Sequence, residues 1–180
     1  SLYTKLPPDT PDDVHESLTR AAKQLEDTIE QVRQMYSELR PGMLDDLGLA
    51  ATIEWQTSEF SRRSEIPCRV VRLDDVTLPD ENSRLTLYRV FQEALSNVAR
   101  HSGATQVEVS VTGSDGHVTI RVEDNGRGIT DEELASPSSL SLSAMRKRLQ
   151  SRGGHLDIRR NNEGGTVVEA TVPLAGTARS

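Results

Sequence analysis

Apolar residues recur alternately four and three positions apart through the N-terminal part of the chain. This heptad spacing holds over about four repeats and predicts a long helix from about Asp12 to Leu39. The apolar stripe of such a helix needs cover, which favours a dimer or bundle interface; packing on the chain's own domain is the alternative. Pro41 and Gly42 end the pattern. The stripe consists of Val14, Leu18, Ala21, Leu25, Thr28, Val32, Met35 and Leu39.

Two further helices and a short strand are expected in the next part of the chain. The second helix runs from Leu44 to Arg63, and Cys68 to Val71 reads as a strand before an acidic loop. The third helix runs from about Glu81 to His101 and carries a polar face opposite its apolar one. The apolar residues of the second helix are Leu47, Leu49, Ile53, Trp55 and Phe60, and those of the third are Leu87, Phe91, Ala94, Leu95 and Val98.

Strict alternation of valine and isoleucine with polar residues follows the third helix. The alternating positions are Val107, Val109 and Val111, then Val118, Ile120 and Val122. They predict two strands joined by a turn at residues 113–116. A final hairpin is expected from Leu156 and Ile158 to Val168, Ala170 and Val172, around a turn at residues 161–165.

Residues 125–143 lack periodicity and contain Pro137 with many serines, so a long loop is expected there. A short basic helix from Met145 to Ser151 follows, and Gly153 with Gly154 ends it. Together these elements predict an α/β fold: a two-layer sandwich in which helices cover one face of a mixed or antiparallel sheet.

Composition narrows the class of protein. The 180 residues are 34% hydrophobic and 27% charged, as in an ordinary globular chain, and aromatic residues make up only 3%. A net charge of −7 argues against sequence-blind nucleic-acid binding. Cys68 is the only cysteine, which excludes an internal disulfide and a cysteine-based zinc site. With no apolar run of about 18 residues and no signal peptide, this part of the protein is expected to be cytoplasmic and without membrane contact. Anchoring of a longer parent protein in the inner membrane stays open.

Candidate chemistry lies on the polar face of the third helix and after the second strand of the first hairpin. Glu93 and Asn97 are four residues apart, one above the other on the helix. Asp124 ends a strand and is followed by Gly126 and Gly128, which allow a ligand to lie against bare backbone. Oxygen ligands of this kind suit a nucleotide with Mg²⁺. The alternatives are a solvated helix face and a simple Asp-Asn-Gly turn.

The roles of two basic side chains at the end of the third helix are left open by the sequence. His101 suits the negative end of the helix dipole better than a phosphate contact. Arg100 has the same ambiguity, although its guanidinium suits a triphosphate.

These segments resemble a known family. EALSNVARHSGA is similar to the N box of the GHKL ATPases, EDNGRGI to their first glycine box, and GGTVVEATVPL to the closing one. SELRPGMLDDLGLAATIEW resembles the segment that joins the dimerisation helices to the catalytic domain in sensor histidine kinases of the nitrate-sensor class. The resemblance covers about residues 37–174 and implies the Bergerat ATP-binding fold.

The resemblance also implies roles for individual residues. Glu93 would be the catalytic or orienting acid, Asn97 the Mg²⁺ ligand, and Asp124 the group that reads adenine. Thr166 would be a secondary contact in the adenine pocket. The other nucleotide contacts that the resemblance implies are Arg100, His101, Gly126, Gly128, Ile129, Leu142 and Met145.

The resemblance implies a division into residues 1–40, the second helix of a dimerisation bundle; residues 41–176, the catalytic domain; and a tail at 177–180. The chain would be a homodimer through its N-terminal helix, and a response-regulator receiver domain would be its partner. The enzyme would be an ATP-dependent protein histidine kinase. Its acceptor histidine is expected upstream of Ser1, because His15 lies on the second helix and is better explained as a solvated side chain.

One departure from the family pattern leaves the function open. The family's ATP lid ends in G-x-G-L-x-G-M, whereas this chain has Ser139, Ser141 and Ala144 at the glycine positions. If those positions need positive φ, each substitution costs about 1–2 kcal/mol; if they serve flexibility alone, the loss is small. The alternative function is therefore a degenerate module that binds nucleotide weakly or not at all and serves dimerisation and partner docking.

Overall fold

The structure, a computed structural model, describes residues 42–78, 80–135 and 140–174, with backbone alone at 131, 135 and 140–144. The heptad helix expected at residues 12–39 lies outside this range. Residues Gly42–Ser180 form a compact unit of their own.

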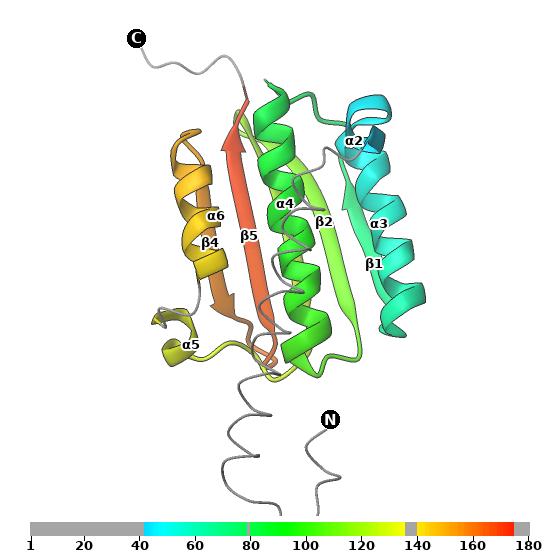
Figure 1. Cartoon of the computed structure of the whole chain (residues 1–180), viewed down its shortest axis with the longest axis vertical. Coiled ribbons are helices and arrows are strands. Elements are labelled where there is room, and N and C mark those ends of the chain that lie inside the picture. Colours follow the sequence, from blue (N-terminus) through cyan, green and yellow to red (C-terminus); the bar gives the residue numbers. More distant parts are fainter. Residues whose placement is uncertain (1–41, 79, 136–139, 175–180) are drawn as a thin grey trace, which may run out of the picture. The chain divides into compact units, whose positions relative to one another are not determined.

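The described residues form a five-stranded mixed sheet (Figure 1). Its spatial order is β1-β2-β3-β5-β4; β1 and β2 are parallel, and the other neighbours are antiparallel. Both hairpins that the alternating pattern predicted are present. The strands are β1 (Cys68–Leu73), β2 (Val107–Ser114), β3 (His117–Asp124), β4 (His155–Arg160) and β5 (Thr166–Pro173).

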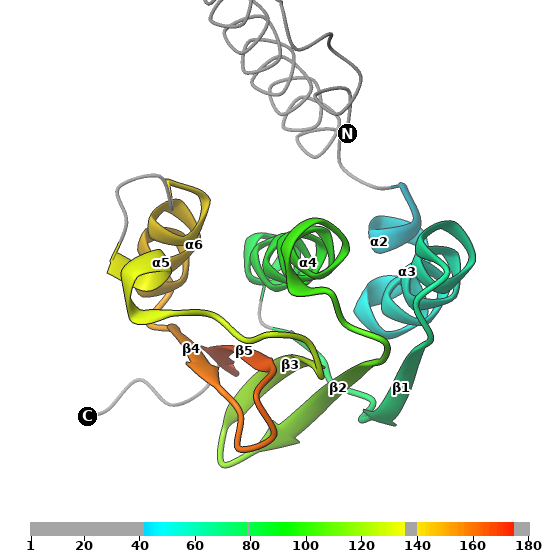
Figure 2. The same cartoon turned by 90° about the horizontal axis from the view of Figure 1, so that it is seen from below.

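Helices cover one face of this sheet. Figure 2, which looks along the sheet, shows α3, α4 and α6 side by side on the same face. The two-layer α/β sandwich expected from the sequence is thereby confirmed. The helices are α2 (Gly42–Asp46), α3 (Gly48–Ser64), α4 (Glu81–Asn97), the π-helical turn η2 (Val98–Ser102), α5 (Asp131–Ala135) and α6 (Leu140–Gln150).

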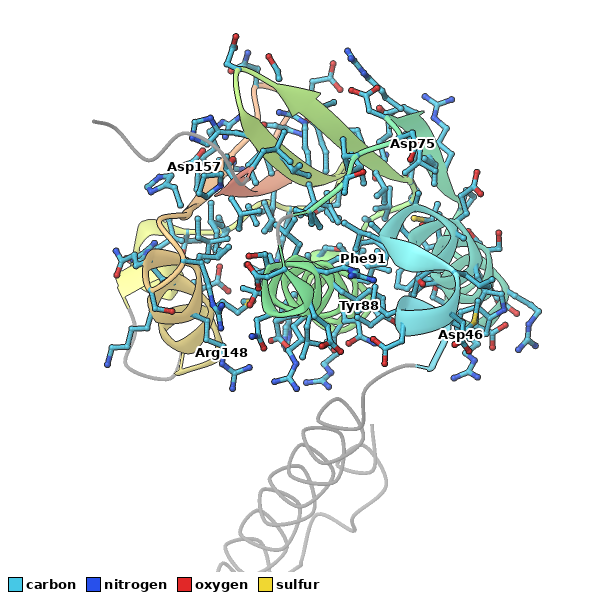
Figure 3. The ribbon with its side chains drawn as sticks, turned by 90° about the horizontal axis from the view of Figure 1, so that it is seen from above. Asp46, Asp75, Tyr88, Phe91, Arg148 and Asp157 are labelled. Atoms are coloured by element: carbon cyan, nitrogen blue, oxygen red, sulfur yellow. The ribbon has the colours of Figure 1, made fainter. Side chains whose placement is uncertain are left out.

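The core lies between the helices and the sheet and is mostly aliphatic, as the composition indicated. Each apolar position predicted for β2, β3 and the third helix is buried. Figure 3 shows Phe91 pointing from α4 toward the sheet, and its ring lies 6.2 Å from that of Tyr88. Burial of such a side chain contributes about 1.5–3 kcal/mol, so α4 is held mainly by this face.

The N-terminus of α4 is fixed by a cap. The Asp80 carboxylate accepts a hydrogen bond from the Ser83 amide at 2.8 Å and another from the Ser83 hydroxyl at 2.7 Å. These bonds, the one from the hydroxyl most of all, hold the pKa of Asp80 below its usual value. The Arg152 guanidinium, just beyond α6, approaches the same carboxylate at 3.4 Å, so the start of α4 is tied to the end of α6.

Two helical predictions were wrong in detail. The single helix expected from Leu44 to Arg63 is divided into α2 and α3 at Gly48, whose φ of 79° only glycine adopts without strain. Leu47 and Trp55, expected to face the core, have 61% and 49% of their surface exposed. Leu47 lies at the break between the two helices. Trp55 lies within α3, two positions after the buried Ile53, and this spacing places it on the opposite side of the helix.

The segment expected to be a long loop contains helical structure. α5 begins after Thr130, where the Thr130 hydroxyl accepts from the Glu133 amide at 3.2 Å and the Glu133 carboxylate accepts from the Thr130 amide at 2.9 Å. This reciprocal pair is a capping box, a signal that the search for apolar periodicity does not detect. α6 begins at Leu140, five residues before the expected Met145.

Two buried threonines of α3 give a matched test of the packing. The Thr57 hydroxyl is buried without a hydrogen-bond partner among the described residues, whereas the Thr52 hydroxyl donates to the Gly48 carbonyl at 2.6 Å. We expect Thr57→Val to raise the free energy of unfolding by about 1 kcal/mol, because it removes a buried unsatisfied group. Thr52→Val should lower it by a similar amount. Urea unfolding measures both, and equal effects of the two substitutions would contradict the assignment.

Candidate functional site

Hydrogen bonds link the turn that continues α4 to the glycine-rich segment after β3. Residues 125–130, here called the glycine loop, run past the end of α4 toward α5 (Figures 1 and 2). The Arg127 amide donates to the Ser102 carbonyl at 2.9 Å, and Arg127 Nε donates to the His101 carbonyl at 2.8 Å. The two motifs singled out in the sequence therefore meet at this edge of the sheet.

The helix changes from α-helical to π-helical geometry at this contact. The expected helix to His101 is α-helical to Asn97 and then makes the π-helical turn η2. Single π-helical turns within helices frequently occur at functional sites. Here the turn carries the carbonyls of His101 and Ser102, which accept the hydrogen bonds from the glycine loop.

Asp124 is a buried carboxylate with one oxygen satisfied. It ends β3 with 5% of its surface exposed, and its Oδ1 accepts from the Gly126 amide at 2.8 Å. Within the described residues no donor reaches Oδ2. Oδ2 is not among the buried side-chain atoms that lack a partner, so a ligand can reach it and donate a hydrogen bond to it.

Thr166 lies beside Asp124 although 42 positions separate them in the chain. The β3–β5 pairing continues to Glu123 and Val167, so Asp124 and Thr166 occupy the next position of the same register. Both side chains are on the face that the helices cover, since they continue the series of Val122 and Val168. The structure thus brings these two predicted site residues together.

Glu93 and Asn97 are half-buried on α4. No described residue forms a hydrogen bond or ion pair with either side chain, so their oxygens are available to a ligand. The side chains of Arg100 and His101, on η2, are exposed. Arg100 has an interaction within the protein. His101 accepts a hydrogen bond from Arg127 Nε through its backbone carbonyl.

The other three residues predicted to contact the nucleotide with their side chains are Ile129, Leu142 and Met145, and they differ in burial. Met145 is buried in the core with 8% of its surface exposed, and Ile129 is half-buried against the same core. The Leu142 side chain lies outside the described range, although its backbone belongs to α6.

The glycines of the loop pack against the protein's own backbone. A Cβ on Gly126 would overlap the Ser102 carbonyl oxygen, and a Cβ on Gly128 would overlap the Gly164 carbonyl oxygen. Gly128 also has a φ of 76°, which side chains disfavour. These glycines were expected to allow a ligand to lie against bare backbone; in the structure their near neighbours are other segments of the chain.

Sequence reasoning missed two residues that hold this region together. Asn125 Oδ1 accepts from the Thr105 and Gln106 amides, each at 2.9 Å, and so fixes the start of β2 to the glycine loop. Arg127 binds the Glu133 carboxylate with both terminal nitrogens, at 3.2 and 2.6 Å, in addition to its backbone contacts with η2. An Asx residue directly after a strand is the signal that could have identified Asn125.

No cluster of three or more histidine, cysteine, aspartate or glutamate side chains that could hold a metal exists among the described residues. In the same part of the chain no helix is long and apolar enough to cross a membrane.

Comparison with known proteins assigns the fold to a family. The model of the histidine kinase-, DNA gyrase B- and HSP90-like ATPases matches residues 82–176, more than half of the chain. The chain belongs to this family. The matched range contains α4, the glycine loop, α6 and the final hairpin, and therefore every residue predicted for the site.

Relatives of known name are sensor histidine kinases. The chain is 32% identical to sensor histidine kinase MctS of Rhizobium johnstonii over 90% of its length and 35% of that protein. It is 30% identical to the nitrate/nitrite sensor protein NarX of Escherichia coli over 89% of its length and 27% of that protein. The chain thus spans about a third or less of these relatives. They support the histidine-kinase interpretation rather than the degenerate module.

A solved structure supports the same fold. The histidine kinase domain of the blue-light activated histidine kinase from Erythrobacter litoralis superposes with a TM-score of 0.61 at 24% identity, over 71% of this chain and 61% of that one. The two chains therefore share the fold described above, a sheet with helices on one face.

The Arg127–Glu133 contact is sensitive to acid. The Arg127 guanidinium, followed by the Thr130 amide, lowers the pKa of Glu133 from 4.5 to about 2. Since the pKa is lower in the folded state, the ionised carboxylate stabilises the fold above about pH 4.5, and this contribution is lost as the pH falls toward 2. The contact lies at the surface, so salt also weakens it.

We expect Glu133→Gln to be less stable than the original protein at pH 7, with a difference that shrinks between pH 5 and pH 2. Urea unfolding across this range measures the difference. Glu132→Gln, at the exposed neighbouring position, is the control and should show no such trend. A Glu133→Gln difference that is constant with pH would mean that the ionised carboxylate contributes nothing.

Proposed function

We propose that this domain binds ATP with Mg²⁺ between the polar face of α4 and the end of β3. The observation that carries the proposal is the buried Asp124 carboxylate, whose Oδ2 has no donor within the described residues. The family membership supports the use of ATP. The finer assignments below rest on the position and chemistry of individual side chains.

The adenine end of the site is assigned to Asp124 and Thr166. Asp124 Oδ2 accepts a hydrogen bond from the amino group of adenine, which guanine lacks at that position. The Thr166 hydroxyl, across the β3–β5 register, provides a second polar contact with the base. A charge-assisted hydrogen bond in a buried position gives both affinity and selectivity.

The phosphate end is assigned to the C-terminal part of α4. The Asn97 amide oxygen would hold Mg²⁺, a hard ion that takes one or two protein oxygens and completes its shell with phosphate and water. The fit is good because Asn97 is half-buried and its side chain has no partner among the described residues. Glu93, one turn earlier, orients a water or accepts a proton, and Arg100 contributes positive charge near the triphosphate.

We infer that the whole protein transfers the γ-phosphoryl group to a histidine and then to an aspartate of a response regulator. The bond from the γ-phosphorus to the bridging oxygen breaks, ADP leaves, and a phosphorus–nitrogen bond forms on the acceptor. The acceptor histidine is assigned to a segment before Ser1, and dimerisation to the heptad helix at residues 12–39. The division into residues 1–40, 41–176 and 177–180 belongs to the same proposal, as does a cytoplasmic location.

The competing function is a nucleotide-free docking module. The serines and alanine of the lid were its main support, and the relatives named as sensor histidine kinases favour the kinase. Calorimetry with ATP and Mg²⁺ separates the two functions, because a docking module gives no heat of binding even with nucleotide at millimolar concentration.

We expect Asp124→Asn and Asn97→Asp to lower ATP affinity by about ten- to a hundredfold, because each removes one polar contact with the nucleotide or its metal. Photolabelling with an ATP analogue measures the loss. Asp115→Asn, in the β2–β3 turn, and Asn82→Asp, at an exposed position of α4, are matched controls and should label normally. Unaltered labelling of both site variants would refute the assigned site.

A further inference from the structure

One side chain in the β4–β5 turn connects Asp124 to the turn that precedes Thr166. Asn161 Nδ2 donates to the Asp124 carbonyl at 3.2 Å and to Glu123 Oε1 at 3.0 Å. Its Oδ1 accepts from the Glu163 amide at 2.9 Å and from the Gly165 amide at 2.8 Å. A single half-buried carboxamide therefore makes four hydrogen bonds, two to the end of β3 and two to the turn that leads into Thr166.

The end of β3 needs this carboxamide because the sheet stops there. The described β3–β5 pairing ends at Glu123 and Val167. Beyond it, Gly165 comes so close to Asp124 that a Cβ on the glycine would overlap the Asp124 carbonyl oxygen. Asn161 Nδ2 supplies that carbonyl with a donor where the ladder no longer does, and so satisfies a strand-end group that would otherwise be unpaired.

We propose that Asn161 is the positioning residue for adenine selection in this domain. It fixes the Asp124 backbone from one side and the Gly165–Thr166 backbone from the other, so the two base contacts keep a constant spacing. It does not touch the nucleotide. This inference rests on the assignment of Asp124 and Thr166 to the base and deepens it.

The physical basis is the narrow geometry of hydrogen bonds. A bond to the amino group of adenine needs a donor–acceptor distance near 3 Å and a nearly linear angle. Binding sites hold such groups to within about 0.5 Å through the hydrogen bonds of supporting residues. When the Asp124 carbonyl loses its donor, the backbone of Asp124 is less firmly held and its carboxylate can shift. The hydrogen bond to the adenine amino group then contributes less binding free energy, while stacking of the base and the phosphate contacts persist.

Asn161→Asp separates this role from the folding of the turn. Aspartate keeps an oxygen for the Glu163 and Gly165 amides but has no N–H for the Asp124 carbonyl. Asn162→Asp is the matched control: the same change in charge at the next residue, whose side chain is exposed. Affinities are measured for ATP and for purine riboside triphosphate, which lacks the amino group, and thermal unfolding is recorded for each variant.

The original chain and Asn162→Asp should prefer ATP by about tenfold or more, the size expected for a hydrogen bond to a charged acceptor. Asn161→Asp should reduce the preference to about two- or threefold, mostly through weaker ATP binding. A variant that weakens both nucleotides equally would overturn the proposal, since a structural role alone moves both. Equal binding of both nucleotides by the original chain would instead refute adenine reading by Asp124.

A second variant covers the case in which Asn161→Asp unfolds because its carboxylate faces Glu123. Glu123→Gln added to Asn161→Asp restores a hydrogen bond between these side chains with reversed polarity, whereas the Asp124 carbonyl still lacks its donor. The double variant should fold and remain unselective. Recovery of the original preference for ATP in the double variant would overturn the proposal.

Discussion

The site depends on one contact between backbones, that of the glycine loop with the π-helical turn at the end of α4. The Arg127 amide and side chain bind the carbonyls of Ser102 and His101, and Gly126 lies so close to Ser102 that a side chain would not fit. The buried face of α4 already packs on the sheet, and this contact adds a direct link between the segment that follows Asp124 and the turn that follows Asn97. The hydrophobic core sets the layers, and this contact sets the site.

Features that repeat along the chain were predictable from sequence. Alternating valines define β2 and β3 because each buried strand face requires a period of two, and the apolar stripe from Leu87 to Val98 defines the side of α4 that faces the sheet. The fold class and the placing of Glu93 and Asn97 away from the core follow from the same periods. The roles of these two residues and of Asp124 were implied by family resemblance and remain proposals.

Features that arise where two segments distant in sequence come into contact could not be predicted from such periodic patterns. Gly126 is required by Ser102, Gly165 by Asp124, and Asn161 by the point at which the β3–β5 pairing ends. None of these requirements produces a periodic pattern or a local motif, because the partner residue in each case lies at least 24 positions away. Trp55 was grouped with the apolar residues of its helix because of its residue type, although its spacing from Ile53 places it on the exposed side of α3.

The altered lid has a physical explanation that does not involve loss of nucleotide binding. Ser141 and Ala144 replace glycines of the family pattern, and the structure includes both in α6, with the negative φ of a right-handed helix. The strain considered for positive φ therefore does not arise at these two positions. Glycine within a helix costs about 1 kcal/mol relative to alanine, so these substitutions favour the helix that begins at Leu140. The two substitutions agree with the start of α6 at Leu140, before the expected Met145.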